Sequence, residues 1–207
     1  MTAPDPTRAC PNCGAALPTM LAYSRMVNCD FCGSSVVLED DVLRRAGEAG
    51  EMQDAPELVA IGQPVTLATH GTFTATGHVR YDYGRGHWDE YHGALSNGDI
   101  VWVSVDEGDI VLQHHLSDRP RKGRAAFRLG AEVTVNGVTY ACSEVDNAVA
   151  VAFRGQLPEE IVLGETHLFA NFTGPRGAIL SGEIWDGGVA WYAGHWIDPF
   201  DVERLTG

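Results

Sequence analysis

Four cysteines near the N-terminus restrict the fold of this chain more than any other feature. Cys10 and Cys13 stand in CPNCG, and Cys29 and Cys32 stand in CDFCG, which gives the spacing C-x2-C-x15-C-x2-C. A two-residue gap lets both sulfurs of a pair reach one ion, and zinc binds four thiolates at about 2.3 Å. The sequence therefore predicts a zinc ribbon. The alternative, a pair of redox or disulfide CxxC motifs, lacks the βαβ pattern that surrounds a thioredoxin-like motif.

The expected zinc ion is structural rather than catalytic. Four protein thiolates leave no coordination position for a substrate or a water molecule. A ribbon within residues 1–38 is also too short to bury enough apolar surface without a metal. Residues 39–56 are polar and contain Gly47 and Gly50, so we interpret them as a linker.

The charge balance bears on partners and location. The 207 residues include 28 Asp and Glu against 14 Lys and Arg, a formal net charge of −14. Because such a surface repels phosphate, nucleic-acid binding is not expected. No apolar run reaches the roughly 18 residues of a membrane span, and the N-terminus has no apolar signal region. With free thiols at the metal site, these features predict a cytoplasmic protein without a transmembrane segment.

Short apolar runs separated by turn signals follow the linker, which is typical of a mainly β region. Asx-Gly pairs between apolar runs favour tight hairpins, because these residues adopt positive φ at low cost. The expected hairpins turn at Asn97-Gly98, Asn136-Gly137 and Asp186-Gly187.

The β region also shows an internal similarity. IGQPVTLATHGTFTATGHV and LGAEVTVNGVTYACSEV each begin with a Gly, a short strand, a turn and a longer strand. About five short strands per half favour a duplicated small β-barrel, preferably SH3-like, or one paired sandwich. The predicted repeats span residues 57–118 and 126–207, and the basic stretch at residues 119–125 connects them.

The segment HWDEYH, residues 87–92, is the densest cluster of polar and aromatic groups. In a strand, Trp88, Glu90 and His92 share one face, while His87, Asp89 and Tyr91 share the other. Glu90 and His92 are weak candidates for an acid–base pair or for metal ligands. A half-buried strand with Trp88 in the core is the structural alternative, because one strand supplies at most two ligands per face.

These residues also carry a resemblance to a known family. Trp88, Glu90 and Tyr91 form a Trp-x-Glu-Tyr strand, and a hairpin with Asn97, Gly98 and Trp102 follows. In the second half, the similar segments are GQLP at residues 155–158, NFTGPRG at residues 171–177, and the late Tyr192 and Gly194. In the order of these motifs, residues 57–205 resemble the bacterial domain of unknown function 4178, which is frequently accompanied by an N-terminal zinc ribbon.

This resemblance has three departures and a modest implication. Gln156 stands where a glutamate is usual, Asn171 where an aspartate is common, and His195 where a glutamate is common. Relatives are encoded near polyamine-synthesis-type enzymes, small membrane proteins and envelope-stress factors, so the resemblance implies an accessory role in a multi-protein system.

We therefore expect a non-catalytic adaptor that binds a protein partner through an acidic and aromatic surface. That predicted interaction surface consists of Trp88, Glu90, Tyr91 and Trp102. The first alternative is an enzyme or small-ligand binder with a pocket between the β halves. Its predicted lining is Trp88, Glu90, His92 and Trp102, with Glu183 as a further candidate. The second alternative is nucleic-acid binding through the ribbon and Arg8, Arg25, Arg44 and Arg45.

Overall fold

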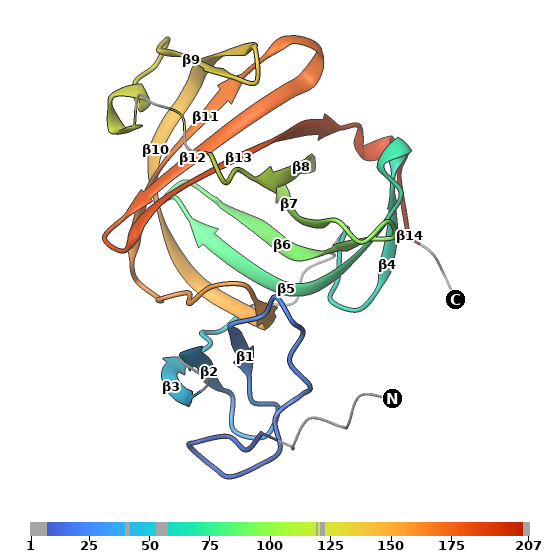
Figure 1. Cartoon of the computed structure of the whole chain (residues 1–207), viewed down its shortest axis with the longest axis vertical. Coiled ribbons are helices and arrows are strands. Elements are labelled where there is room, and N and C mark those ends of the chain that lie inside the picture. The colour runs from blue at the N-terminus through green and yellow to red at the C-terminus, as the bar shows by residue number, and fades with distance from the viewer. Residues whose placement is uncertain (1–7, 40–41, 53–57, 119, 121–122, 205–207) are drawn as a thin grey trace.

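A computed structural model describes residues 8–39, 42–52, 58–118, 120 and 123–204 of the chain. Antiparallel strands dominate these residues, which confirms the expected mainly β class (Figure 1). The strands are β1 (Met26–Asn28), β2 (Ser34–Glu39), β3 (Val42–Glu48), β4 (Pro64–Leu67), β5 (Thr72–Asp82), β6 (His87–Leu95), β7 (Ile100–Asp106), β8 (Asp109–His115), β9 (Glu132–Val135), β10 (Val138–Leu157), β11 (Thr166–Thr173), β12 (Ala178–Trp185), β13 (Gly188–Ile197) and β14 (Val202–Arg204). The helical turns are η1 (Ala68–His70), η2 (Gly123–Ala126), η3 (Pro175–Gly177) and η4 (Pro199–Asp201). At three or four residues each, no helix in the described part of the chain is long enough to cross a bilayer.

Eight strands pair in a closed ring in the order β5-β6-β7-β8-β13-β12-β11-β10, and β10 pairs again with β5. We call this arrangement the strand ring. The 20-residue β10 makes closure possible, because register shifts after Cys142 and Ala150 bend it. It pairs in succession with β9, β11, β5 and β1.

All three expected hairpins are present. Asn97-Gly98 joins β6 to β7, Asn136-Gly137 joins β9 to β10, and Asp186-Gly187 joins β12 to β13. Positive φ at both central residues occurs at Asn136 and Gly137, with values of 49° and 78°, whereas neither Asp186 nor Gly187 has positive φ. In the first hairpin only Gly98 has positive φ, because the loop from Leu95 to Asp99 is longer than a two-residue turn.

Strand alternation divides the apolar residues between the two faces of the ring. The inner face carries a core that includes Tyr81, Trp102 and Phe169. On the outer face, one core beneath β4 includes Tyr91 and Leu67, and another beside β9 includes Trp191. Because the outer cores take up the apolar side chains of the opposite face, the ring interior has room for polar groups.

The strands of both predicted repeats contribute to this one ring. The pairs β8–β13 and β5–β10 connect residues 57–118 with residues 126–207. These residues form a single continuous sheet. The duplication into two small barrels stays a prediction. Of the predicted connector, residues 119, 121 and 122 lie outside the described residues, and η2 begins at Gly123.

The N-terminal ribbon joins the ring through β1, where Met26 pairs with Leu157 of β10. Part of the segment 39–56, which the sequence analysis treated as a linker, forms β3 and pairs with β2. The Gln156 side chain strengthens the joint: its Oε1 accepts from the Leu21 amide at 2.9 Å, and its Nε2 donates to the Thr19 carbonyl at 3.0 Å. The ribbon is thus held to the end of one strand of the ring.

Candidate functional site

The four N-terminal cysteines lie together in a geometry that fits one metal ion. Their Sγ atoms all lie within 4.8 Å of one another, with 3.8 Å between Cys10 and Cys32 and 3.7 Å between Cys13 and Cys29. Metal–sulfur bonds of about 2.3 Å in a tetrahedron place the sulfurs about 3.8 Å apart. A disulfide needs about 2.05 Å between sulfurs, and these cysteines are free. The arrangement fits a metal centre rather than a disulfide pair.

Two matching turns create this arrangement. The Gly14 amide donates to the Cys10 carbonyl and the Gly33 amide to the Cys29 carbonyl, both at 2.8 Å. Gly14 and Gly33 adopt φ of 76° and 69°, where a side chain would be strained. The Asn12 amide lies 3.6 Å from the Cys32 sulfur and orients it from outside the quartet.

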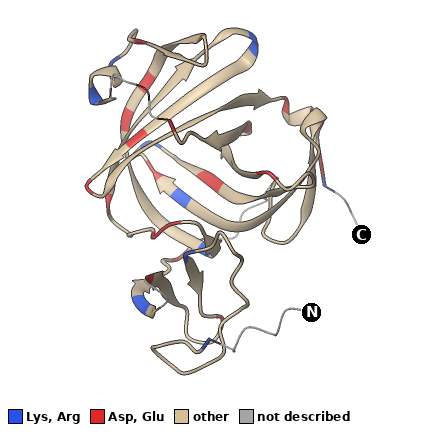
Figure 2. Ribbon diagram, viewed as in Figure 1, with Lys and Arg blue, Asp and Glu red and all other residues tan. Residues whose placement is uncertain are grey.

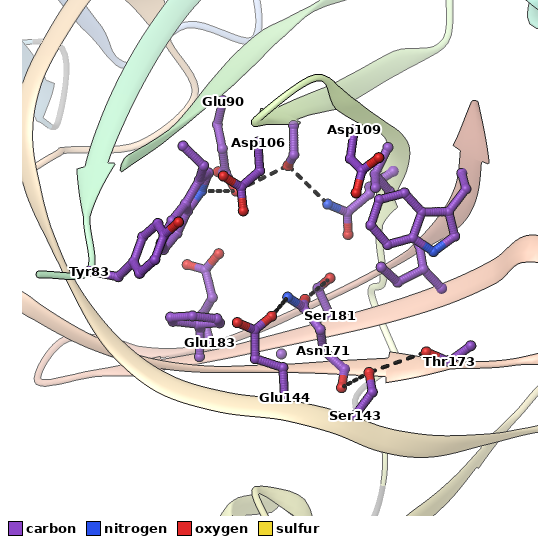
Figure 3. A pocket seen from close by; sticks show the side chains of 18 residues that line it. Tyr83, Glu90, Asp106, Asp109, Ser143, Glu144, Asn171, Thr173, Ser181 and Glu183 are labelled. Atoms are coloured by element: carbon purple, nitrogen blue, oxygen red, sulfur yellow. Dashed lines mark hydrogen bonds between the residues drawn. The ribbon is translucent and has the colours of Figure 1, made fainter. Parts of the chain in front are cut away.

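A pocket of about 160 Å³ opens inside the strand ring (Figure 3). Its rim carries exposed side chains, including Asp106, Asp109 and Glu144, while Gln113 and Ser181 are buried deeper. Aromatic rings form part of its wall. These are Tyr83, Trp88, Phe169 and Trp196. A cavity of about 150 Å³ accommodates a molecule the size of benzene, so the pocket fits a small ligand.

One wall of the pocket is a chain of hydrogen bonds across β6, β7 and β8. Gln113 Nε2 donates to Ser104 Oγ, and the Ser104 hydroxyl donates to Glu90 Oε1, both at 3.2 Å. The Trp88 indole N–H donates to the same Glu90 oxygen at 3.1 Å. Glu90 Oε1 is therefore fixed by two donors from neighbouring positions of the sheet.

The facing wall comes from β10, β11 and β12. Asn171 Nδ2 donates to Glu144 Oε2 at 2.9 Å, and Asn171 Oδ1 accepts from the Ser181 hydroxyl at 2.8 Å. Figure 3 shows Glu183 pointing into the space between this wall and Glu90. Acidic groups from opposite sides of the ring thus converge on one pocket, and Figure 2 shows acidic residues on several ring strands.

Burial and the proximity of other carboxyl groups raise the pKa values of two glutamates. Burial, followed by the negative charge of Glu183, raises the pKa of Glu90 to about 8, although the Trp88 and Ser104 hydrogen bonds act in the opposite direction. Burial and then Glu183 raise the pKa of Glu159 to about 7. Near neutral pH, the protonated and the ionised forms of both groups are therefore populated, and a nearby positive charge would favour the ionised forms.

A histidine contacts the acidic cluster from beyond the pocket wall. The His167 ring stacks on Trp185, and its Nδ1 lies 3.5 Å from Glu183 Oε2. Burial disfavours the imidazolium, but Glu183 and the charges of Glu165 and Glu159 outweigh that cost, so the pKa of His167 is raised. The His167 charge partly compensates Glu183.

The structure separates the residues that the sequence analysis grouped. Trp88 and Glu90 line the pocket together, as their i, i+2 spacing predicts. His92 and Trp102 line a different pocket, and burial lowers the pKa of His92 to about 4. Glu90 and His92 therefore do not form the predicted acid–base pair within one pocket.

Two of the four residues of the predicted interaction surface are buried, and Trp88 and Glu90 are half-buried. Tyr91 is 2% exposed and packs in an outer core, where its ring stacks on His78. Trp102 is 7% exposed and belongs to the inner core. Because strand alternation sends Tyr91 and Glu90 to opposite faces, the four residues cannot form one docking surface.

Sequence reasoning missed most of the polar lining of the pocket, but some of it had a signal. The turn at Asn97-Gly98 sets a register in which Ser104 lies opposite Glu90. The Glu107-Gly108 turn likewise places Gln113 opposite Trp102. Glu144 had no such signal, because a bulge separates it from the turn at Asn136-Gly137 and a long connection separates β10 from β11.

The strand ring and these two sites define a mainly β protein with a candidate cysteine metal centre and an acidic internal pocket. A family model described as Domain of unknown function (DUF4178) matches residues 60–199, which is more than half of the chain. The chain belongs to this family. No curated protein and no solved structure matches this chain.

Proposed function

We propose that this chain is a non-enzymatic module that binds a small molecule in the pocket of its strand ring and holds its ribbon together with a structural zinc ion. The observation that carries the proposal is the internal pocket. It combines aromatic wall residues, a solvent-exposed rim and buried polar groups, which are features of small-molecule sites.

The cysteine geometry supports zinc at the ribbon. Four sulfurs at tetrahedral spacing suit Zn²⁺, and soft thiolates disfavour Mg²⁺ or Ca²⁺. Elemental analysis of the purified protein is expected to find one zinc ion per chain. The double variant Cys13→Ser, Cys32→Ser is expected to lose it. Another metal, or no metal, in the unaltered protein would contradict this assignment.

The internal position of Trp88, Glu90 and Trp102 supports a pocket binder over the adaptor that the sequence analysis preferred. Side chains inside the ring can recognise a small molecule but not a flat protein surface. A protein partner, a cytoplasmic location and the accessory role in an envelope-stress or polyamine-linked system stay expectations that come from composition and resemblance.

A pocket-blocking variant tests the proposed function. Thr173 lies at the exposed rim, and its hydroxyl donates to Ser143 at 3.2 Å. Thr139 is an exposed strand residue with a similar hydroxyl bond to Thr134 at 3.0 Å, away from the pocket. Thr173→Trp is therefore expected to fill the rim, while Thr139→Trp is its matched control.

The measurement is ligand-observed NMR with a fragment set that contains cationic, neutral and anionic compounds. At least one fragment is expected to bind the unaltered chain and Thr139→Trp, and to lose that signal with Thr173→Trp. If Thr173→Trp affects no fragment of any charge class, the proposed ligand-binding function is wrong.

A further inference from the structure

We propose that the pocket selects a small organic ammonium ion, an inference that rests on the proposed ligand-binding function and names its ligand class. The pocket offers hydrogen-bond acceptors and several carboxyl groups to an occupant, and many donors of its buried walls are engaged within those walls.

Five polar side chains in the walls of the pocket already donate hydrogen bonds inside those walls. The Trp88 indole and the Ser104 hydroxyl both donate to Glu90, and the Ser181 hydroxyl donates to Asn171. The amides of Gln113 and Asn171 donate to Ser104 and Glu144. A ligand that needs to accept hydrogen bonds, such as a carboxylate or a phosphate, finds these groups occupied.

One buried acceptor is left without a partner. Gln113 is 6% exposed and lines the pocket, and its Oε1 accepts no hydrogen bond from the described residues. When Glu90 is ionised, Ser104 donates its proton to Glu90, so Gln113 presents its NH₂ group to Ser104. An unsatisfied buried acceptor is costly, and a ligand with N–H groups would satisfy it.

The charged groups of the lining also favour a cation over an anion. Five lining residues carry carboxyl groups, and none of the described lining residues is Lys, Arg or His. The nearby Arg85 pairs with Asp146 at 2.8 Å and lies over the Tyr83 ring. The carboxyl groups are Glu90, Asp106, Asp109, Glu144 and Glu183.

An organic cation fits this pocket better than a metal ion does. Among the described residues, the cysteines are the one group of three or more His, Cys, Asp or Glu placed to hold a metal. The pocket carboxylates are therefore spread around the wall instead of converging on a point. The exposed indole of Trp196 adds a site for cation–π contact with an ammonium group, and the rings of Trp88 and Tyr83 add apolar surface for its carbon chain.

Isothermal titration calorimetry on the full chain at low ionic strength tests this ligand class. The probes are hexylammonium chloride, hexan-1-ol, sodium hexanoate and calcium chloride, so that the first three differ mainly in the head group. Hexylammonium is expected to bind one site per chain, at least tenfold more tightly than hexanol or hexanoate. Equal binding of hexanol, tighter binding of hexanoate, or displacement of hexylammonium by stoichiometric calcium would overturn the proposal.

Variants connect the binding to the pocket. Glu183→Gln and Glu90→Gln are each expected to weaken hexylammonium binding at least tenfold. Gln113→Leu, which removes the unpartnered acceptor without changing charge, is expected to weaken it about fivefold. Asp186→Asn, which removes one charge from the hairpin turn after Glu183, is the control and is expected to change the affinity less than twofold.

The outcomes separate this inference from the proposed function. Should Glu183→Gln fail to fold, Glu90→Gln and Gln113→Leu decide the result against Asp186→Asn. Affinities equal to that control would show that hexylammonium binds elsewhere. Fragments that Thr173→Trp blocks, but that are neutral or anionic, would leave the binding function standing and refute the ammonium preference.

Discussion

At the scale of single residues, Glu90 couples the stability of the protein to pH. Its pKa is raised to about 8 in the folded state from an ordinary value of 4.5. The folded chain thus holds a proton that the unfolded chain releases, and this contribution to stability is lost as pH rises from about 4.5 to 8. We expect Glu90→Gln to become more stable relative to the unaltered chain across this window, as measured by urea unfolding at pH 5 and pH 8.5.

Asp89, the next residue on β6, provides a control of opposite sign. Burial acts against its charge, but hydrogen bonds and charges from His78 and Arg80 lower its pKa to about 2. Its contribution is therefore present above about pH 3.8 and lost as pH falls toward 2. We expect Asp89→Asn to lower the free energy of unfolding by about 3 kcal/mol at both pH 5 and pH 8.5, because it breaks a buried pair.

An identical pH profile for Glu90→Gln and the unaltered chain would refute the assignment of the pH dependence to Glu90.

Glu90 also predicts that ammonium binding releases a proton. An adjacent cation favours the carboxylate, so hexylammonium is expected to bind more tightly as pH rises from 6 to 8.5. The carboxyl group of Glu90 interacts electrostatically with four titratable groups, those of Glu183, Glu159, Tyr81 and Tyr192. Calorimetry at pH 7 in phosphate and in MOPS, neither of which carries a primary ammonium group, measures the released protons from the difference in heat. Equal observed heats in the two buffers, before any correction for buffer ionisation, together with a flat pH profile, would contradict this prediction.

At the scale of elements, the joint between β1 and β10 depends on an amide. Gln156 donates to the Thr19 carbonyl and accepts from the Leu21 amide, whereas a glutamate could only accept. We expect Gln156→Glu to cost about 1 kcal/mol and to speed hydrogen exchange in the ribbon. Gln63→Glu, in an exposed loop, adds the same charge and is the control. Unchanged exchange of the Leu21 amide would mean that this bond does not hold the joint.

The elements also show which parts of the fold can be predicted from the sequence. Asn136-Gly137 and Asp186-Gly187 predicted hairpins because turn chemistry acts between neighbours in the chain. The pairing of β5 with β10 has no comparable signal. It joins Tyr81 to Ala150 and depends on a bulge in β10 and on the burial of three separate cores. Long-range closure is a property of the whole packing, which no local motif specifies.

At the scale of the whole molecule, the lack of a local signal for long-range pairing also explains which parts of the candidate site could be predicted from the sequence. The cysteine spacing predicted the metal centre because all four ligands lie in two tight turns. Trp88 and Glu90 were found because alternation along one strand relates them. The pocket itself needs Glu183 and Glu144 from strands far along the chain, and only the closed ring brings these to Glu90. A local motif can thus identify one wall of the pocket but not the opposite one.

Metal removal tests how the ribbon and the ring depend on each other. The ribbon core consists of few residues around Cys10, Cys29 and Val36, so it is expected to unfold when a chelator removes the ion. The ring is held by strand pairs and by cores that contain no metal ligand, and the ribbon adds Met26 and Val37 to the core near one end of β10.

We therefore expect hydrogen exchange after chelation to accelerate at the Gly14 and Gly33 amides and at the β1–β10 pair. Protection of the pairs β6–β7 and β12–β13 is expected to persist, and hexylammonium is expected to bind with an affinity within threefold of the untreated protein. Re-addition of zinc, but not magnesium, should restore the ribbon. Loss of protection throughout the ring would show that the ribbon is required for the ring to close, because docking at Met26 would then stabilise the bent strand β10.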